Sequence, residues 1–128
     1  MQRLVRWADV AVCNLRASVP ERLGIAYEQL AVINPKLVYA SITAYGEKGQ
    51  DATLPGYDLV VQAKAGITDS RRLPDGTPVG SHIFYADMAG AMLSAYGIML
   101  ALRQRDTTGR GQKIEVNLLH TYLSLQTV

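Results

Sequence analysis

The chain has 128 residues and a mass of 14.0 kDa, and 48% of its residues are hydrophobic while 19% are charged. This composition excludes wholesale disorder and fibrous architectures, and the length predicts one domain over residues 1–128. Thirteen lysines and arginines against 11 acidic residues give a formal charge of +2. The basic residues are scattered apart from Arg71 and Arg72, so we expect no nucleic-acid partner.

The first third of the chain predicts a strand, helices and a second strand. Val10–Cys13 is short, apolar and β-branched, which is typical of a buried strand. Ser18 begins a capping-box pattern before a short helix over residues 20–23, and a second helix starts near Tyr27. Residues 37–43 have strong β propensity and predict the second strand. A crossover of this size places its two strands parallel.

The rest of the chain continues the alternation of loops, helices and strands. A loop rich in glycine over residues 44–56 precedes a helix over 57–65, and a polar loop over 69–80 follows. A helix over 85–105 is apolar almost all round, which predicts full burial. Residues 113–118 alternate like a strand, and the apolar tail predicts a last helix. The pattern therefore predicts an α/β fold with a Rossmann-like parallel sheet and flanking helices.

The cysteine, histidine and hydropathy patterns indicate the cellular compartment and bear on membrane and metal binding. Cys13 is the lone cysteine, and the sequence does not open with a secretory signal, so we expect a reducing, cytoplasmic compartment. The apolar stretch from Met88 to Leu102 is shorter than a membrane span requires, so we expect no membrane partner. His82 and His120 lie far apart without ligand partners at metal spacing, so no metal is expected. Both ends fall within element-like stretches, which indicates a piece of a longer protein or a core completed by self-association.

Asp87 is the most unusual residue, because it stands alone as a carboxylate between apolar residues 83–86 and 88–93. It is either the N-cap of the long helix or a functional carboxylate at the positive end of the helix dipole. Burial would raise its pKa, whereas free backbone amides would lower it. An ionised carboxylate at this position can attack an activated acyl carbon. Nearby small residues, among them Gly90, leave room for a ligand or for close helix packing.

Two other places are candidates for the same site. Tyr57 and Asp58 open the preceding helix and would supply a hydroxyl and a second carboxylate to a shared pocket, unless Asp58 is simply a first-turn acid. Arg16 follows the first strand, at the sheet edge where ligands gather in open α/β sheets. Arginine suits phosphate recognition, although a solvated surface arginine fits the same sequence.

Taken in order, these segments resemble family III CoA-transferases, which include formyl-CoA and carnitine CoA-transferases and the related α-methylacyl-CoA racemases. The similarity covers nearly the whole chain and depends on the order and spacing of its pieces. Family members are considerably longer, so the resemblance implies that residues 1–128 form a central segment of a larger family fold. The matching segments are Ala8–Arg16, Glu21–Gly24, Asn34–Ile42, Pro55–Gln62, Pro74–Pro78, Ala86–Arg105 and Thr108–Gln112.

The resemblance implies a role for each candidate. Asp87 would attack an acyl-CoA thioester to form an anhydride and then an aspartyl-CoA thioester, and backbone amides at the helix start would stabilise the oxyanion. Tyr57, Asp58 and Gly90 would line the active site, and Arg16 would contact a CoA phosphate. Coenzyme A is then a substrate, and no covalently bound cofactor is expected. The implied partners are an acyl-CoA, a carboxylic acid and a second copy of the chain in a homodimer.

Three functions remain open from the sequence. The first is CoA transfer through Asp87, and the second is a remnant that binds CoA or a protein partner without catalysis. The third is an acyl-CoA racemase. Racemase-like family members carry a histidine where Tyr57 stands, and a tyrosine with an unperturbed pKa of about 10 is a poor base at neutral pH. Transfer is therefore favoured over racemisation.

Overall fold

The computed structural model describes residues 2–126 and contains one parallel sheet with its strands in the order β1-β2-β3. The strands are β1 (Val10–Cys13), β2 (Val38–Thr43) and β3 (Lys113–Asn117). In the register of the sheet, Val10 of β1 is opposite Val38 of β2, and Tyr39 of β2 is opposite Lys113 of β3. The predicted α/β fold with a parallel sheet is confirmed.

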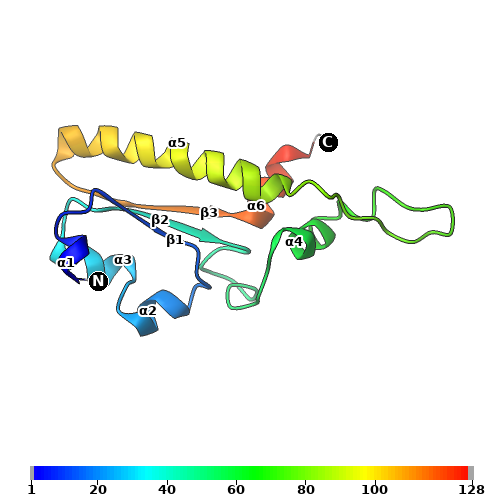
Figure 1. The fold of residues 1–128 in the computed structure, drawn as a ribbon, viewed down its shortest axis with the longest axis horizontal. Helices are drawn as coiled ribbons and strands as arrows, with labels where there is room; N and C mark the ends of the chain where they lie inside the picture. The colour runs from blue at the N-terminus through cyan, green and yellow to red at the C-terminus, as the bar shows by residue number, and fades with distance from the viewer. Residues whose placement is uncertain (1, 127–128) are drawn as a thin grey trace.

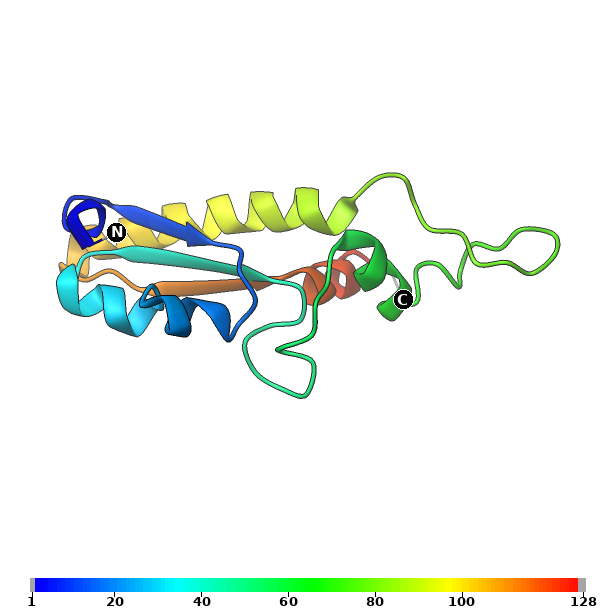
Figure 2. The ribbon, with the colours of Figure 1, turned by 60° about the horizontal axis from the view of Figure 1, so that its bottom comes forward.

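The helices form layers on both sides of this sheet. Figure 1 shows α5 lying along one face while α1, α2 and α3 lie on the other, and Figure 2 shows the same layers after rotation. The helices are α1 (Gln2–Val5), α2 (Val19–Leu23), α3 (Tyr27–Ile33), α4 (Asp58–Lys64), α5 (Tyr85–Thr108) and α6 (Leu118–Leu125).

The core lies on both faces of the central strand. Val38, Tyr39 and Ala40 of β2 are buried, which matches the apolar sequence of a strand covered on both sides. One buried cluster joins the sheet to α1 and α3, and the other lies among α4, α5 and α6. The first contains Val5, Cys13, Leu30, Leu37 and Tyr39, and the second contains Val61, Ala86, Leu118 and Tyr122.

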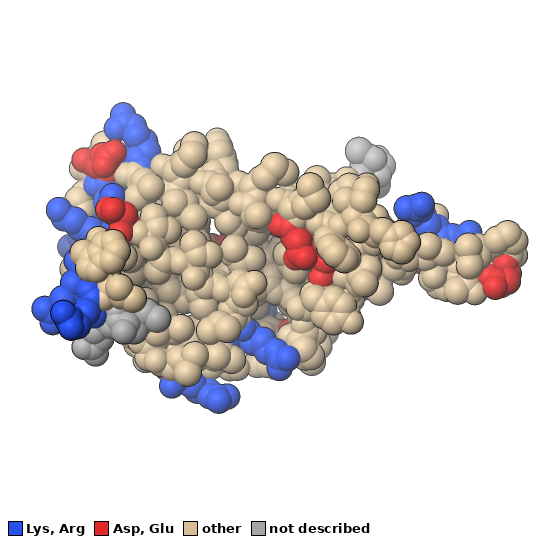
Figure 3. Space-filling view, viewed as in Figure 1, with Lys and Arg blue, Asp and Glu red and all other residues tan. Residues whose placement is uncertain are grey.

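The prediction that the long helix is buried all round is wrong. α5 packs against β2, β3 and α6 through a stripe of small residues, and Ala86, Gly90, Ser94 and Ala101 are the buried ones. Its opposite side is apolar and exposed. Figure 3 shows an uncharged surface along the middle of this helix. The exposed large side chains are Met88, Met92, Leu93, Tyr96, Met99 and Leu100. Sequence could not separate the two sides, because small and large apolar residues alternate around the helix.

Length and composition alone would allow α5 to cross a membrane, since an 18-residue window has a mean hydropathy of 1.3. Of that window 22% is buried, and the helix contacts β2, β3 and α6.

The capping-box prediction at Ser18 is also wrong. The Ser18 side chain caps no backbone N–H of α2, because the residue has helical angles (φ −82°, ψ −11°) instead of the extended conformation that N-caps adopt. The predicted stop at Gly24 is confirmed, and its φ of 71° is left-handed. A side-chain cap occurs at the next helix, where Oε1 of Gln29 accepts the Ala26 N–H at 3.0 Å.

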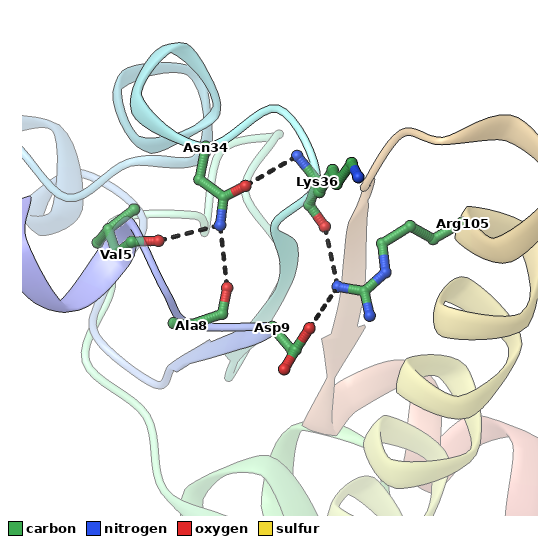
Figure 4. A network of polar contacts seen from close by, with 6 residues as sticks. All are labelled: Val5, Ala8, Asp9, Asn34, Lys36 and Arg105. Carbon is green, nitrogen blue, oxygen red and sulfur yellow. Dashed lines mark hydrogen bonds and ion pairs between the residues drawn. The ribbon is translucent and has the colours of Figure 1, made fainter.

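A polar network fixes the amino-terminal end of the sheet (Figure 4). The Asn34 amide donates to the carbonyl oxygens of Val5 and Ala8, both at 3.0 Å. Arg105 of α5 forms an ion pair with Asp9 at 2.9 Å and donates to the Lys36 carbonyl oxygen at 3.2 Å. These contacts hold α1, the start of β1 and the end of α5 together. They lie at the opposite end of the strands from the carboxyl edge of the sheet.

Between α4 and α5 the chain extends away from the sheet as an arm, residues 69–80, visible in Figures 1 and 2. Arg72 and Pro78 form an antiparallel bridge, and Oδ1 of Asp75 accepts the Thr77 N–H at 2.9 Å within the turn. The predicted polar loop with a Pro-Asp-Gly-Thr-Pro turn is therefore confirmed.

Candidate functional site

A cavity of about 240 Å³ lies where the three strands end. It brings together Arg16, Tyr57 and Asp87, three of the five residues singled out by sequence. The carboxyl edge of a parallel sheet is where ligands bind in open α/β folds, so the position fits a ligand site. Its lining residues are Asn14, Leu15, Arg16, Ile42, Thr43, Ala44, Ala52, Leu54, Gly56, Tyr57, Asp87 and Leu118.

Arg16 and Tyr57 reach this cavity from two different loops. Arg16 lies three residues after the end of β1, and its side chain is exposed. Tyr57 is the N-cap residue of α4, with extended backbone, and 65% of its surface is exposed. Both residues are therefore accessible to a ligand from solvent.

Asp87 lies in the first turn of α5 at the rim of the cavity. It is not the N-cap, as one interpretation of the sequence held, because the helix begins at Tyr85 and Phe84 occupies the cap position. Asp87 is exposed, and it lines the open cavity at the ends of the strands. A carboxylate in this place can meet a ligand held in the cavity.

Asp58 and Gly90 are the two candidates that the cavity does not contain. Asp58 is only 2% exposed, and it lies beneath the start of α5. Gly90 is buried, and a Cβ there would lie 3.4 Å from Cδ2 of Leu118 in α6 and 3.9 Å from Val116 in β3. The structure thus places Gly90 in the packing of α5 against α6 and β3, which is the packing interpretation of the small residues in α5.

The prediction that backbone amides at the start of α5 are free to stabilise an oxyanion is wrong. Oδ2 of Asp58 accepts the N–H groups of Ala86 at 2.9 Å and of Asp87 at 3.0 Å. The Met88 N–H donates to the Phe84 carbonyl oxygen at 3.0 Å, and the Tyr85 N–H is used in the preceding turn. Because these donors are taken, they are not available to stabilise an oxyanion.

The pKa of the Asp87 carboxyl is raised by its surroundings. Partial burial raises the pKa of the Asp87 carboxyl above its usual 3.8, and the negative charge of Asp58 raises it further. The amide contribution that would have lowered the pKa is directed at Asp58 instead. Asp87 is therefore the more basic kind of aspartate, which favours nucleophilic attack when it is ionised.

Sequence reasoning missed the residues that surround Asp58. Gln62 Nε2 donates to Oδ1 of Asp58 at 2.8 Å, and the Tyr122 hydroxyl donates to the same oxygen at 2.5 Å. Gln62 follows Asp58 by one helical turn, a spacing that could have indicated the pair. Tyr122 is 64 residues away, and only the fold brings it near.

Larger hollows lie elsewhere in the part of the chain that the structure describes. One of about 500 Å³ borders Arg6, Trp7 and Arg105 at the opposite end of the strands. Another of about 320 Å³ lies near α2 and α3 and is lined by Glu21, Glu28 and other polar residues. We place the candidate site at the 240 Å³ cavity, because it lies at the carboxyl ends of the strands, where ligands bind in open α/β folds, and brings Asp87 together with Arg16.

Comparison with known proteins finds similarity to CoA-transferases. The sequence model of a family described as CoA-transferase family III matches residues 1–128. An acetyl-CoA:oxalate CoA-transferase of Acetobacter aceti is 44% identical over 117 residues, which is 90% of this chain and 30% of that protein. A succinate–glutarate CoA-transferase of Agrobacterium fabrum is 39% identical over 119 residues, covering 93% and 30% of the two chains.

Solved structures agree with the fold. The crystal structure of Rv3272 from Mycobacterium tuberculosis superimposes with a TM-score of 0.93 at 35% identity, covering 98% of this chain and 35% of that one. A CAIB/BAIF family protein from Brucella suis gives a TM-score of 0.88 at 36% identity, covering 97% and 33%. The chain thus spans about 30% of the length of the curated relatives it matches.

Proposed function

Because the chain belongs to CoA-transferase family III, we propose that it transfers coenzyme A from an acyl-CoA thioester to a carboxylic acid, with Asp87 as the nucleophile. The observation that carries this proposal is the position of Asp87 in one cavity with Arg16, at the carboxyl ends of the strands. The named relatives act on acetyl-CoA, oxalate, succinate and glutarate, so acyl-CoA and small carboxylic acids are the substrate classes that we propose.

In the first half of the reaction, a carboxylate oxygen of Asp87 attacks the thioester carbon. The carbon–sulfur bond breaks, and CoA leaves as a thiolate with the electron pair. The thiolate then attacks the Asp87 carbonyl carbon of the resulting anhydride, which forms an aspartyl-CoA thioester and releases the donor carboxylate. The anhydride keeps the acyl group activated, so CoA moves without hydrolysis.

In the second half, the acceptor carboxylate attacks the aspartyl thioester and displaces the CoA thiolate. The thiolate attacks the acceptor acyl carbon of this second anhydride, which gives the new acyl-CoA and restores the Asp87 carboxylate. Arg16 holds a phosphate group of CoA by charge-assisted hydrogen bonds throughout both halves. Tyr57 borders the reacting groups, and its hydroxyl is a hydrogen-bond donor to a substrate carboxylate.

The proposal is tested by incubating the chain with acetyl-CoA and locating covalent adducts by peptide mass spectrometry. We expect an acyl or CoA adduct on the peptide that contains Asp87, and none in Asp87→Asn. Asp75→Asn is the matched control, because Asp75 lies in the exposed arm away from the cavity. Adducts elsewhere would overturn the assignment of Asp87. CoA binding without any adduct would favour the second candidate function, a binding remnant.

A homodimer is part of the proposal. Its support is the apolar outer side of α5, where Met88, Met92, Tyr96 and Met99 are each about 60% exposed. Contiguous exposed apolar surface of this kind marks an interaction site. Sedimentation of the chain tests it, and a monomer at all concentrations would contradict self-association through this side.

A further inference from the structure

The Asp58 carboxylate is saturated with hydrogen bonds inside the protein. Its Oδ2 accepts the N–H groups of Ala86 and Asp87, and its Oδ1 accepts from Gln62 and from the Tyr122 hydroxyl. With only 2% of its surface exposed, Asp58 cannot touch a ligand in the cavity. A buried charge is kept only where it is paired or fully hydrogen-bonded, and four donors meet that requirement.

The network also holds the segment that leads into α5. Oε1 of Gln62 accepts the Ser81 N–H at 2.8 Å, and Gln62 Nε2 donates to the Ser81 carbonyl oxygen at 3.3 Å. The Ser81 hydroxyl oxygen then accepts the Ile83 N–H at 3.0 Å. Asp58 and Gln62 of α4 thus hold both the end of the arm and the first turn of α5, and Tyr122 adds α6 to the same cluster.

This contact takes the place of an N-cap. Phe84 at the cap position makes no side-chain hydrogen bond, so the first turn of α5 would otherwise have unpaired N–H groups. Asp58 supplies the missing acceptor from another helix, 29 residues earlier in the chain than Asp87. Its oxygen bonds to the backbone of Asp87 itself, so the anchor and the cavity-facing carboxylate share one residue.

We propose that Asp58 is a positioning residue: it fixes the backbone of Asp87 at the rim of the cavity and occupies the amides that would otherwise bind the Asp87 carboxylate. The role in catalysis rests on the proposed function, whereas the role in holding Asp87 does not. Asp58 acts through Asp87, since nothing places it against substrate.

The test compares Asp58→Asn with Asn34→Ala by NMR and by labelling with acetyl-CoA. Asp58→Asn keeps the size of the side chain and removes its charge. Asn34→Ala is the matched destabilised control, because it removes three hydrogen bonds at the other end of the sheet. We expect Asp58→Asn to accelerate hydrogen exchange at the Ala86 and Asp87 amides by about tenfold or more over any change in the β2 amides. In Asn34→Ala, hydrogen exchange at the Ala86 and Asp87 amides should change by the same factor as exchange at the β2 amides.

Labelling gives the second comparison. The rate of Asp87 labelling at saturating acetyl-CoA should fall about tenfold or more in Asp58→Asn with little change in KM, whereas Asn34→Ala should keep the rate. Should Asp58→Asn not fold, Tyr122→Phe removes one donor and leaves the amide cap, and a smaller acceleration at the same two amides is expected. Unchanged exchange at Ala86 and Asp87 would overturn the positioning role. Wild-type chain that is never labelled would overturn the proposed function alone, since the exchange result would still stand.

Discussion

The carboxylates of Asp58 and Asp87 are neighbours of like charge, and Oδ2 of the first accepts the backbone N–H of the second at 3.0 Å. Asp58 has four hydrogen-bond donors, whereas the described structure gives the Asp87 side chain none. The two carboxylates therefore have different roles. One is a buried anchor, and the other is left more basic at the cavity.

We predict that the charged Asp87 carboxylate lowers the stability of the folded chain at neutral pH. Its pKa is raised in the folded chain by partial burial and by Asp58, so folded protein holds the proton more tightly than unfolded protein. The contribution to stability is greatest below the unfolded pKa and is lost as pH rises through the folded pKa. Asp87→Asn should therefore raise Tm by about 1–2 °C at neutral pH, a small gain because water screens the exposed carboxylate, and the gain should vanish at about pH 3.

Asp75→Asn is the control of opposite sign. A hydrogen bond from the Thr77 N–H lowers the pKa of the Asp75 carboxyl, so this group adds stability above its unfolded pKa. Thermal melts at several pH values compare the two variants. A lower Tm for Asp87→Asn at neutral pH would contradict the view that Asp87 is held at a cost.

Arg16→Ala should weaken CoA binding about tenfold or more, because a charge-assisted phosphate contact is lost. Pantetheine lacks the nucleotide phosphates, so its binding should change little. Arg22→Ala is the matched control, since Arg22 is an exposed arginine of α2 that does not line the cavity. Titration calorimetry measures both ligands. Equal losses for CoA and pantetheine would show that Arg16 does not act on phosphate.

Much of this fold could be predicted because its signals are local. Val10–Cys13 and residues 38–43 are strands for their β-branched and apolar content, and Gly24 and Gly66 stop helices in the left-handed conformation. The order of strand and helix then indicated a parallel sheet, and that sheet placed Arg16 at the ligand edge.

The wrong predictions concern the tertiary surroundings of a residue, that is, which side of a helix is buried and which side chains contact it. Asp58 is a first-turn acid of α4, as one interpretation of the sequence held. It is not a carboxylate of the cavity, and its partner Tyr122 is 64 residues away. The apolar composition of α5 indicated burial, yet burial falls on Gly90 and other small residues while Met92 on the opposite side is exposed. Such choices depend on tertiary contacts, which hydrophobic periodicity does not specify.

Gly111→Ala should destabilise the chain strongly, by about 3 kcal/mol or more. A Cβ there would lie 1.9 Å from the Leu37 carbonyl oxygen, and the Gly111 N–H already donates to Pro35 at 2.9 Å, so neither backbone can move away freely. Gly109→Ala is the comparison, because Gly109 has φ +70° but open space around it. That variant should cost only about 1 kcal/mol. Urea unfolding measures both, and equal costs would contradict the close contact.

The ion pair of Glu47 with Lys113 should matter more than its surface position indicates. Burial raises the pKa of the Glu47 carboxyl, but hydrogen bonds from Lys113 and Ser41, together with the charges of Lys113 and Lys48, bring it below its usual 4.5. The Glu47 N–H also donates to Oε1 of Glu115 at 2.8 Å, so the pair ties the loop after β2 to β3. Lys113→Met leaves a partly buried carboxylate unpaired, and a loss of about 1–2 kcal/mol at neutral pH is expected.

The pH dependence identifies the cause of this loss. A depressed folded pKa contributes stability above the unfolded pKa, and the contribution disappears as pH falls through the folded value. The difference between wild type and Lys113→Met should therefore shrink below about pH 4. Lys48→Met should cost much less at neutral pH, because Lys48 is exposed and acts on Glu47 by charge alone. If the two lysine variants lose the same stability, the hydrogen-bonded contact between Lys113 and Glu47 has no special role, and general charge accounts for the anchoring of this loop.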